Sequence, residues 1–479
     1  MEDAKRFLIR TFGCQMNAHD SEKIANLLFH HGYRLADDLE DAQLLLVNTC
    51  SIREKAEHRL YSDLGTLRAW KAAAPQRLLA VGGCVAQQEG EALLHRFDHV
   101  DFVFGTHNLR RVPELAEEAR RGRRALRIEE SASLERFDLP ERHPAYPGAT
   151  PGRAYLTVME GCDMFCSFCI VPTTRGREIS RPAEGILAEA RSLAARGVVE
   201  LTLLGQTVNA YGRHDLRRGR AEQAGTMAFG ELLRALAAIP GLRRLRYTSP
   251  HPLFFDEALI AAHGEVETVC PHVHLPLQSG SDRILEAMRR RYRARDYLRL
   301  VEQLRIARPD LAITSDLIVG FPGETEADFQ ATLDVVREAD LVDSFSFKYS
   351  ARPGTHAADL ADAVPVEEAQ RRLEALQELQ RRLTLGHSTR RVGERTEILV
   401  EGPSRHPGQL QGRDPYHRVV NLLGPGRARP GEFLEVQIVG ASPHSLLARL
   451  RATKPAEPLK PSPGLADEQV RAREAPAGG

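Results

Sequence analysis

Residues 159–182 read MEGCDMFCSFCIVPTTRGREISRP and place three cysteines, Cys162, Cys166 and Cys169, in one short segment. A strand-like run, AYLTVME from Ala154, comes directly before them, so the three thiols can face a common centre at a strand end. A closed zinc site needs a fourth protein ligand, and the sequence offers none nearby. A four-iron cluster held by three thiolates keeps one iron open for a substrate or cofactor. The spacing therefore predicts an iron–sulfur cluster with an open coordination position.

Outward from this segment, a strand followed by a helix repeats six times between residues 148 and 382. The strands are predicted at AYLTVME, VELTLLG, RRLRYTS, HVHLPLQ, AITSDLIVG and SFSFKYS. Segments of helical pattern, such as AEGILAEARSLAARG, separate them. This alternation predicts an α/β fold with a parallel (β/α)6 partial barrel. In such folds the chemistry lies at the carboxyl ends of the strands.

The preceding block, residues 5–121, contains three apolar runs that end in cysteine: FLIRTFGC at Cys14, LLLVNTC at Cys50 and LLAVGGC at Cys84. A helix-like segment follows each run, which predicts an N-terminal parallel α/β domain. The carboxyl ends of parallel strands share one edge of a sheet, so these thiols can converge although they are far apart in the sequence. Helix N-termini at that edge favour thiolates and an anionic cluster. We therefore predict a second cluster with three protein ligands.

The C-terminal part changes from helical to strand-like spacing. Residues 385–451 contain five short strand-like runs separated by Gly and Pro, which predicts a small antiparallel β-barrel similar to nucleic-acid-binding barrels. Residues 452–479 are rich in Pro, Ala and charged residues, and we expect them to be disordered.

Composition narrows the functional class. Lys and Arg together number 65, as do Asp and Glu, so the formal charge is zero and any nucleic-acid site must be a local patch. No apolar run approaches the ~18 residues that span a bilayer, and no secretory signal begins the sequence. We expect a cytoplasmic protein without a membrane partner. Seven cysteines in a reducing compartment favour metal binding or catalysis over disulfides.

The cysteine spacing on a six-unit partial barrel resembles the radical S-adenosylmethionine (SAM) superfamily. Two cysteine triplets with a C-terminal barrel resemble its methylthiotransferase family, and the barrel resembles a TRAM domain, over nearly the whole chain. The branch that modifies adenosine 37 of tRNA is matched by long motifs: TFGCQMNAHDSE, NTCSIREKAE, GGCVAQQEGE, LPLQSGSDRILEAMRRRY, SDLIVGFPGET and YSARPGT.

This resemblance implies two 4Fe–4S clusters and SAM as cofactors. Cys162, Cys166 and Cys169 would hold the catalytic cluster, whose electron cleaves SAM to a 5′-deoxyadenosyl radical. Cys14, Cys50 and Cys84 would hold an auxiliary cluster that carries the sulfur. The implied reaction adds a methylthio group to C2 of N6-dimethylallyladenosine. Candidate SAM contacts lie at strand ends: Gly205, Gln206, Gln278, Ser279, Asp316 and Gly320, with Arg175 after the cysteine segment.

The expected partners are tRNA, recognised at adenosine 37 of its anticodon stem-loop, and a reducing electron donor such as a flavodoxin or ferredoxin. We expect a monomer. Arg residues beside Tyr suit phosphates and unstacked bases, and the candidates for RNA binding are Arg289, Arg290, Arg291, Arg413, Tyr416 and Arg418.

Two alternatives remain open from the sequence. The first is a sister methylthiotransferase that acts on threonylcarbamoyladenosine of tRNA or on a ribosomal-protein aspartate. The second is a non-catalytic RNA-binding protein with structural metal sites. The sequence also departs from the family pattern at two places: an additional Pro250, and a loop from Gly212, GRHDLRRGRAEQAGT, that is longer and more basic.

Overall fold

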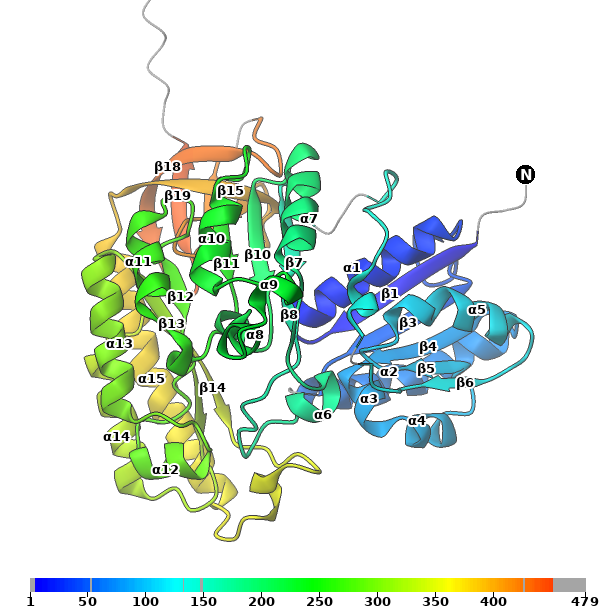
Figure 1. Cartoon of the computed structure of the whole chain (residues 1–479), viewed down its shortest axis with the longest axis horizontal. Coiled ribbons are helices and arrows are strands. Elements are labelled where there is room, and N and C mark those ends of the chain that lie inside the picture. The colour runs from blue at the N-terminus through cyan, green and yellow to red at the C-terminus, as the bar shows by residue number, and fades with distance from the viewer. Residues whose placement is uncertain (1–4, 52–53, 132, 147–149, 425–426, 451–479) are drawn as a thin grey trace, which may run out of the picture.

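A computed structural model of the chain describes residues 5–51, 54–131, 133–146, 150–424 and 427–450. The predicted disorder of residues 452–479 falls outside these ranges. No helix in the described ranges is long and apolar enough to cross a membrane. The described chain forms an N-terminal α/β unit, a central α/β unit and a C-terminal barrel (Figure 1).

The N-terminal unit is a six-stranded sheet in the order β2-β1-β3-β4-β5-β6, and every neighbouring pair is parallel. Its strands are β1 (Arg6–Phe12), β2 (Arg34–Leu35), β3 (Leu44–Thr49), β4 (Leu78–Gly83), β5 (Phe102–Phe104) and β6 (Ala125–Arg127). Its helices are α1 (Gln15–His30), α2 (Glu54–Ala73), α3 (Cys84–Glu89), α4 (Glu91–Arg96) and α5 (Val112–Arg120). All residues of β3 and β4 are buried, which agrees with their unbroken apolar runs.

The central unit contains six parallel strands in two three-stranded sheets, β11-β10-β7 and β12-β13-β14. A single parallel bridge between Leu245 and Val269 joins the sheets. The strands are β7 (Arg153–Thr157), β10 (Glu200–Leu204), β11 (Arg244–Tyr247), β12 (His272–His274), β13 (Ala312–Val319) and β14 (Asp343–Lys348). The longer helices between and after them are α7 (Ala183–Ala195), α10 (Phe229–Ala237), α11 (Glu257–Glu265), α13 (Ala294–Ala307), α14 (Glu326–Glu338) and α15 (Val366–Arg390). One apolar core runs through the whole unit.

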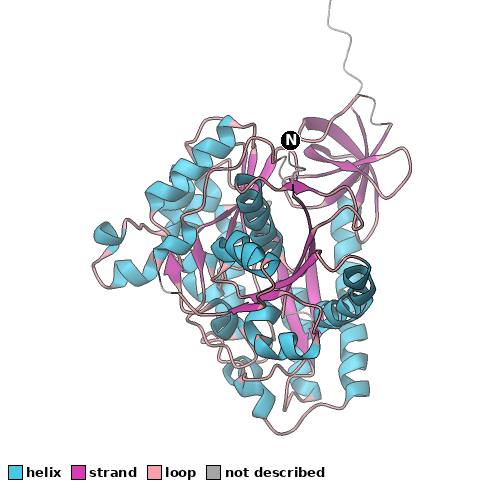
Figure 2. Cartoon of the chain, turned by 90° about the vertical axis from the view of Figure 1, so that its right-hand side faces the viewer, coloured by secondary structure: helices cyan, strands magenta, loops and turns pink. Residues whose placement is uncertain are grey.

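The C-terminal unit is a closed barrel in the order β15-β16-β17-β19-β18. Its strands are β15 (Arg395–Pro403), β16 (Leu410–Arg413), β17 (Val419–Leu423), β18 (Phe433–Ala441) and β19 (Leu446–Leu450). All pairs are antiparallel except β17 with β19. Figure 2 shows this barrel at the upper right, set beside the helices of the central unit. The predicted fold class is confirmed in all three units.

Candidate active site

Cys162, Cys166 and Cys169 lie between the short strand β8 (Met159–Glu160) and helix α6 (Val171–Arg175), after the first strand of the central unit. Gly161 begins this segment at φ +80°, and a Cβ there would lie 2.0 Å from the carbonyl oxygen of Arg177. Only glycine permits this approach. Ser167 anchors the other side, because its backbone N–H donates to Met288 and its hydroxyl to Ala287. The segment is therefore held at both ends, and we call it the cluster loop (residues 161–170).

The three thiols of the cluster loop lie in an apolar setting with Met164, and Phe254 packs against them. Burial raises the pKa of Cys162. Burial and then the neighbouring Cys166 raise the pKa of Cys169 to about 12. Two polar groups reach the sulfurs: the Thr207 hydroxyl is 3.0 Å from Cys162 Sγ, and Arg290 Nη1 donates to Cys166 Sγ at 3.4 Å. The thiols thus lie close together, shielded from water and next to one buried cation.

The second triplet comes from three adjacent strands. Cys14 is the N-cap of α1 after β1, Cys50 follows β3, and Cys84 is the first residue of α3 after β4. Cys50 is hydrogen-bonded to both other thiols, which raises its own pKa. These bonds, with the charge of Arg175, lower the pKa of Cys14 to about 6 and that of Cys84 to about 7. The convergence predicted from the strand ends is present in the structure.

The donor set can be tested against the cofactor that the sequence implies. In the described ranges no three or more His, Cys, Asp and Glu side chains are grouped to hold a single metal ion. The cysteines lie near one another in two sets of three, and thiols are the ligand type of iron–sulfur clusters.

Arg175 gives a second test of whether the residues around Cys14, Cys50 and Cys84 suit an iron–sulfur cluster. Its Nη2 donates to Asp20 Oδ2 at 2.7 Å, and the side chain is 3% exposed. Its Nη1 is buried without a hydrogen-bond partner, although its charge lowers the pKa of Cys14 and Cys84. A buried unpaired donor is costly unless an acceptor completes it. An anionic group held by the second triplet would serve as that acceptor, so the residues fit a cluster there.

Arg175 was predicted as a SAM contact; in the structure its Nη2 is bonded to Asp20, and its assignment to SAM stays a prediction. The arginine faces Asp20 of α1 and the second triplet, because α6 directs it into the interface between the N-terminal and central units. Thr106 and His107 of the N-terminal unit hold the α6 backbone at Thr174 and Arg175. Sequence reasoning placed Arg175 near the cluster loop but had no means to find its partner.

Two predicted SAM contacts do adjoin the cluster loop. Gln206 follows β10, and its Oε1 accepts a hydrogen bond from the backbone of Gly161 at 2.5 Å, while its Nε2 is buried without a partner. Gly205 brings the same strand end against Met159, where a Cβ would lie 2.6 Å from Met159 Cγ. This strand end is thus positioned to contact a ligand of the cluster loop.

Gln278 and Asp316 adjoin one another on the second sheet. The backbone N–H of Gln278 donates to the carbonyl of Asp316 at 2.8 Å. The carboxylate of Asp316 lies 3.2 Å from His274 Nε2. Their assignment to SAM stays a prediction.

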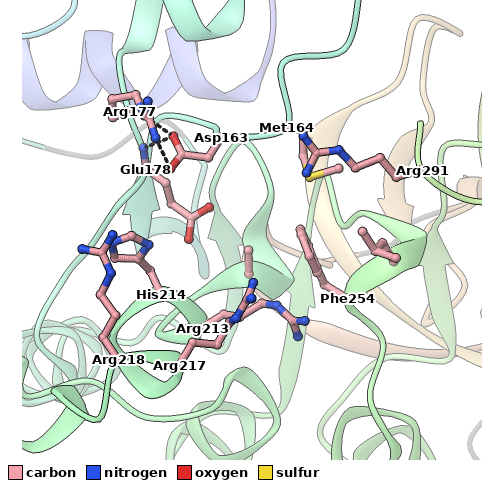
Figure 3. A pocket seen from close by; sticks show the side chains of 12 residues that line it. Asp163, Met164, Arg177, Glu178, Arg213, His214, Arg217, Arg218, Phe254 and Arg291 are labelled. Atoms are coloured by element: carbon pink, nitrogen blue, oxygen red, sulfur yellow. Dashed lines mark hydrogen bonds and ion pairs between the residues drawn. The ribbon is translucent and has the colours of Figure 1, made fainter. Parts of the chain in front are cut away.

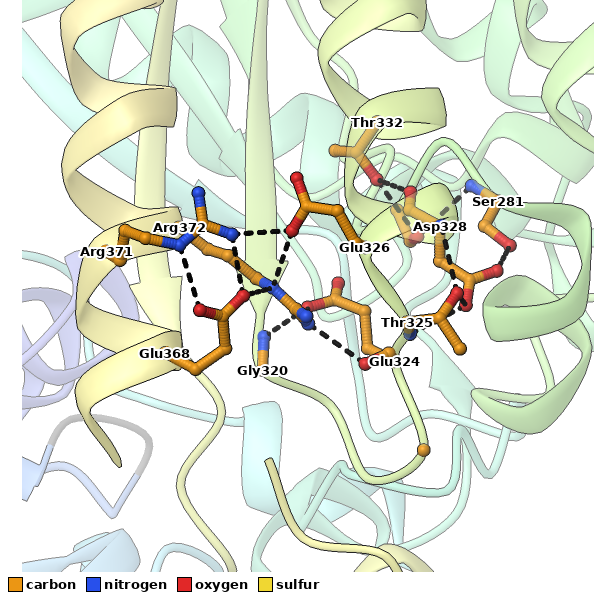
Figure 4. Close-up of polar contacts among 12 residues, drawn as sticks. Ser281, Gly320, Glu324, Thr325, Glu326, Asp328, Thr332, Glu368, Arg371 and Arg372 are labelled. Atoms are coloured by element: carbon orange, nitrogen blue, oxygen red, sulfur yellow. Dashed lines mark hydrogen bonds and ion pairs between the residues drawn. The ribbon is translucent and has the colours of Figure 1, made fainter. Parts of the chain in front are cut away.

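Ser279 and Gly320 have other partners than a cofactor. The Ser279 hydroxyl is fully buried against Thr332 of α14. The Gly320 backbone donates to Glu324, which Arg372 of α15 also binds (Figure 4). A Cβ on Gly320 would lie 2.8 Å from that of Ala369. These turns pack on helices α14 and α15, and the assignment of Ser279 and Gly320 to SAM stays a prediction.

The predicted RNA contacts differ in their exposure to solvent. Arg289 and Arg291 are exposed at positive φ on the turn before α13, whereas Arg290 between them is buried. Its inward contacts, Cys166 and the carbonyl of Pro276, leave it unavailable to RNA. Sequence alone cannot tell which of three consecutive arginines is buried. The conformation of the turn buries Arg290 and leaves Arg289 and Arg291 exposed.

The barrel candidates lie at its junction with the central unit. Arg418 is 9% exposed and donates to Asp343 at 2.7 Å. Arg413 pairs with Glu401, and the Tyr416 hydroxyl donates to Asp310. The contacts of Arg418 and Tyr416 join the barrel to the central unit, whereas the Arg413–Glu401 pair lies within the barrel, and the assignment of these residues to RNA stays a prediction.

A cavity of ≈ 560 Å³ lies beside the cluster loop (Figure 3). Asp163 and Met164 of the loop line it on different sides, Asp163 beside Glu178 and Met164 beside Phe254 (Figure 3). Five arginines line it: Arg177, Arg213, Arg217, Arg218 and Arg291. Three of them come from α8 (Arg213–Arg217) and the residue after it, in the basic loop that the sequence analysis noted. The sequence signal was present, but only the fold places that loop at the cluster loop.

Comparison with known proteins matches each of the three units to a protein family or domain. The uncharacterized protein family UPF0004 matches residues 6–105, the radical SAM superfamily residues 156–336 and the TRAM domain residues 389–450. Among solved structures, the radical SAM methyltransferase TsrM from Kitasatospora setae is similar in fold, with a TM-score of 0.53, 16% identity and coverage of 74% of each chain.

Curated relatives are much closer in sequence. A tRNA-2-methylthio-N(6)-dimethylallyladenosine synthase from Cereibacter sphaeroides is 47% identical, over 93% of this chain and 98% of the relative. One from Acidithiobacillus ferrooxidans is 48% identical, over 93% and 97%. With the two cysteine triplets and the three matched units, these relatives show that the chain belongs to the tRNA-2-methylthio-N(6)-dimethylallyladenosine synthase family within the radical SAM superfamily.

Proposed function

We propose that this chain adds a methylthio group to C2 of N6-dimethylallyladenosine at position 37 of tRNA. The observation that carries the proposal is the placement of two thiol triplets on either side of one short helix. Helix α6 begins two residues after Cys169 and ends at Arg175, whose charge acts on Cys14 and Cys84. It also packs against α3, which begins at Cys84. The two triplets are therefore linked through one short helix.

Membership of the superfamily implies SAM and 4Fe–4S clusters as cofactors. Cys162, Cys166 and Cys169 would hold one cluster, and Cys14, Cys50 and Cys84 the other. When bound, the first supplies the electron that cleaves SAM and the second carries the sulfur to be inserted.

The residues of this chain hold and shield these groups. Thr207 and Arg290 fix two of the sulfurs by hydrogen bonds. Met164, Phe168 and Phe254 surround the thiols with apolar side chains, which keeps water away from a reactive radical. Gln206 adjoins the cluster loop with a free amide N–H for SAM, and Gln278 and Asp316 are proposed as further contacts.

Substrate and partners follow from the family and the barrel. The TRAM barrel and the relatives' names support tRNA as substrate. In this proposal the anticodon stem-loop presents adenosine 37 to a cytoplasmic monomer, and a small reducing protein such as a flavodoxin or ferredoxin donates the electron. The exposed Arg289 and Arg291 are proposed to contact the RNA.

Metal analysis distinguishes this function from a non-catalytic metal protein. After anaerobic reconstitution we expect about eight iron and eight sulfide ions per chain and cleavage of SAM. One or two zinc ions without SAM cleavage would refute the proposal. Nucleoside analysis of tRNA from a deletion strain then identifies the substrate. Loss of the methylthio group from dimethylallyladenosine alone is expected, whereas a change in threonylcarbamoyladenosine would favour the sister reaction.

A further inference from the structure

The arginine-lined cavity beside the cluster loop (Figure 3) has an unbalanced charge. Arg177 is paired, since its Nε donates to Asp163 at 2.7 Å. The guanidinium groups of Arg217, Arg218 and Arg291 form no ion pair or hydrogen bond with any residue in the described ranges. Arg213 likewise forms none there and lies 4.8 Å from the ring of Phe254. The cavity thus gathers four guanidinium groups whose hydrogen-bonding capacity is not used by the protein.

The acidic side chains of the cavity do not offset this charge. Asp163 is occupied by Arg177. Burial raises the pKa of Glu178, the other acidic side chain of the lining, so that at most two carboxylates face five arginines. The whole chain has equal numbers of basic and acidic side chains. The excess of positive charge is therefore a property of this cavity and not of the protein in general.

The cavity lies next to the cluster loop, which indicates that its ligand is part of the substrate. Asp163 and Met164 lie between Cys162 and Cys166 on the cluster loop, so a ligand in the cavity is next to the reaction centre. Phe254 belongs both to the cavity lining and to the apolar shell of the three thiols. A substrate whose base reaches the thiols would place its backbone near these arginines.

We propose that this cavity binds a backbone phosphate of the RNA next to the nucleotide that is modified. The inference rests on the proposed function and adds a site to it. Guanidinium groups bind phosphate oxygens by paired, charge-assisted hydrogen bonds. A target base in an RNA loop is recognised after it leaves the stack, and gripping the adjacent phosphate holds the nucleotide in that conformation. Arg217 and Arg218 make the contact, Arg291 lines another side of the cavity (Figure 3), and Phe254 keeps Arg213 in place.

The test compares two arginine variants of the same loop. Arg217→Ala/Arg218→Ala removes two cavity arginines, whereas Arg220→Ala removes an exposed arginine that does not line the cavity. Reconstituted full-length proteins are titrated into a fluorescent anticodon stem-loop RNA that contains N6-dimethylallyladenosine, at several salt concentrations. We expect the double variant to bind about tenfold more weakly, with a salt dependence shallower by about 1 for each lost phosphate contact. Arg220→Ala should bind like the wild type. The melting temperatures of all three proteins check that folding is intact.

Neutral RNA linkages locate the phosphate. Methylphosphonate is placed at one linkage at a time around the modified nucleotide. One position should weaken binding to the wild type and to Arg220→Ala, but should cause no further loss for Arg217→Ala/Arg218→Ala. Inorganic phosphate serves as the probe for a free anion. The RNA assignment is overturned if inorganic phosphate binds in the cavity while no single methylphosphonate linkage weakens binding to the wild type selectively. The site then binds free phosphate.

The outcomes separate this inference from the proposed function. Wild type that binds and modifies the stem-loop, together with a double variant of unchanged affinity and salt dependence, refutes the phosphate site alone. Wild type that neither binds nor modifies the stem-loop refutes both.

Discussion

Arg290 Nη1 donates a hydrogen bond to Cys166 Sγ at 3.4 Å, and this arginine is 5% exposed. The carbonyl of Pro276 and the hydroxyl of Tyr292 complete its contacts, so the cation is fixed beside a proposed cluster ligand. Hydrogen bonds to cluster sulfurs and local charge set the reduction potential. We therefore expect Arg290 to influence a cluster held by Cys166.

Replacing this cation with a neutral side chain of similar length should make the cluster harder to reduce. For Arg290→Met we expect a more negative midpoint potential and SAM cleavage slower by about tenfold or more, the usual effect of losing such a partner. A redox titration followed by electron paramagnetic resonance measures the potential. Arg289→Met, at the exposed neighbouring position, is the matched control. Equal potentials in the two variants would show that Arg290 has no such influence.

Substitutions in the two cysteine triplets should have different effects on SAM cleavage and on thiolation. Cys14→Ala is expected to retain SAM cleavage but to abolish thiolation, because Cys14 belongs to the triplet that lies across α6 from the cluster loop. Cys166→Ala should abolish both. Iron analysis and the yield of 5′-deoxyadenosine, measured beside the methylthio product, distinguish them. Normal thiolation by Cys14→Ala would contradict the assignment of the second triplet.

The close approach of Gly13 to Cys50 should be needed for the second triplet to bind its cluster. A Cβ there would lie 2.4 Å from Cys50 Cβ, at a φ of +141° that side chains rarely adopt. For Gly13→Ala we expect the iron content to fall by about half, with SAM cleavage retained. Gly185→Ala is the control, since its Cβ would meet nothing within 4 Å. Full iron content in Gly13→Ala would mean that the loop relaxes without losing its ligands.

The buried pair of Arg175 and Asp20 should stabilise the interface between the N-terminal and central units. Arg175→Met leaves the buried Asp20 carboxylate without its partner, and removal of one member of a buried pair costs about 3–5 kcal/mol. Urea unfolding can be followed by the fluorescence of Trp70, the single tryptophan of the chain, in the N-terminal unit.

The double variant Arg175→Met/Asp20→Asn removes both charges and should recover much of the lost stability. Both variants lack the Nη1 donor of Arg175 and are expected to bind the second cluster more weakly than the wild type. If the single and double variants unfold alike, the carboxylate is not the source of the loss.

Sequence alone indicated the architecture and the six cysteines. Apolar runs of strand length that alternate with helical segments permit few arrangements, and parallel strands bring their carboxyl ends to one edge. Cys14, Cys50 and Cys84 could therefore be predicted to converge across 70 positions of the chain, and the structure places them in hydrogen-bond contact.

Only the tertiary structure decided which arginines lie beside the thiols, at the barrel junction or on the surface. Arg289, Arg290 and Arg291 are identical in the sequence, but positive φ at the outer two leaves them exposed while Arg290 is buried on Cys166. Arg175 and Arg418 were predicted to bind ligands, yet each pairs with a carboxylate of another unit, Asp20 and Asp343. The reason is physical: strand ends follow from local periodicity, whereas the partner of a long charged side chain depends on which distant segments the fold brings within reach.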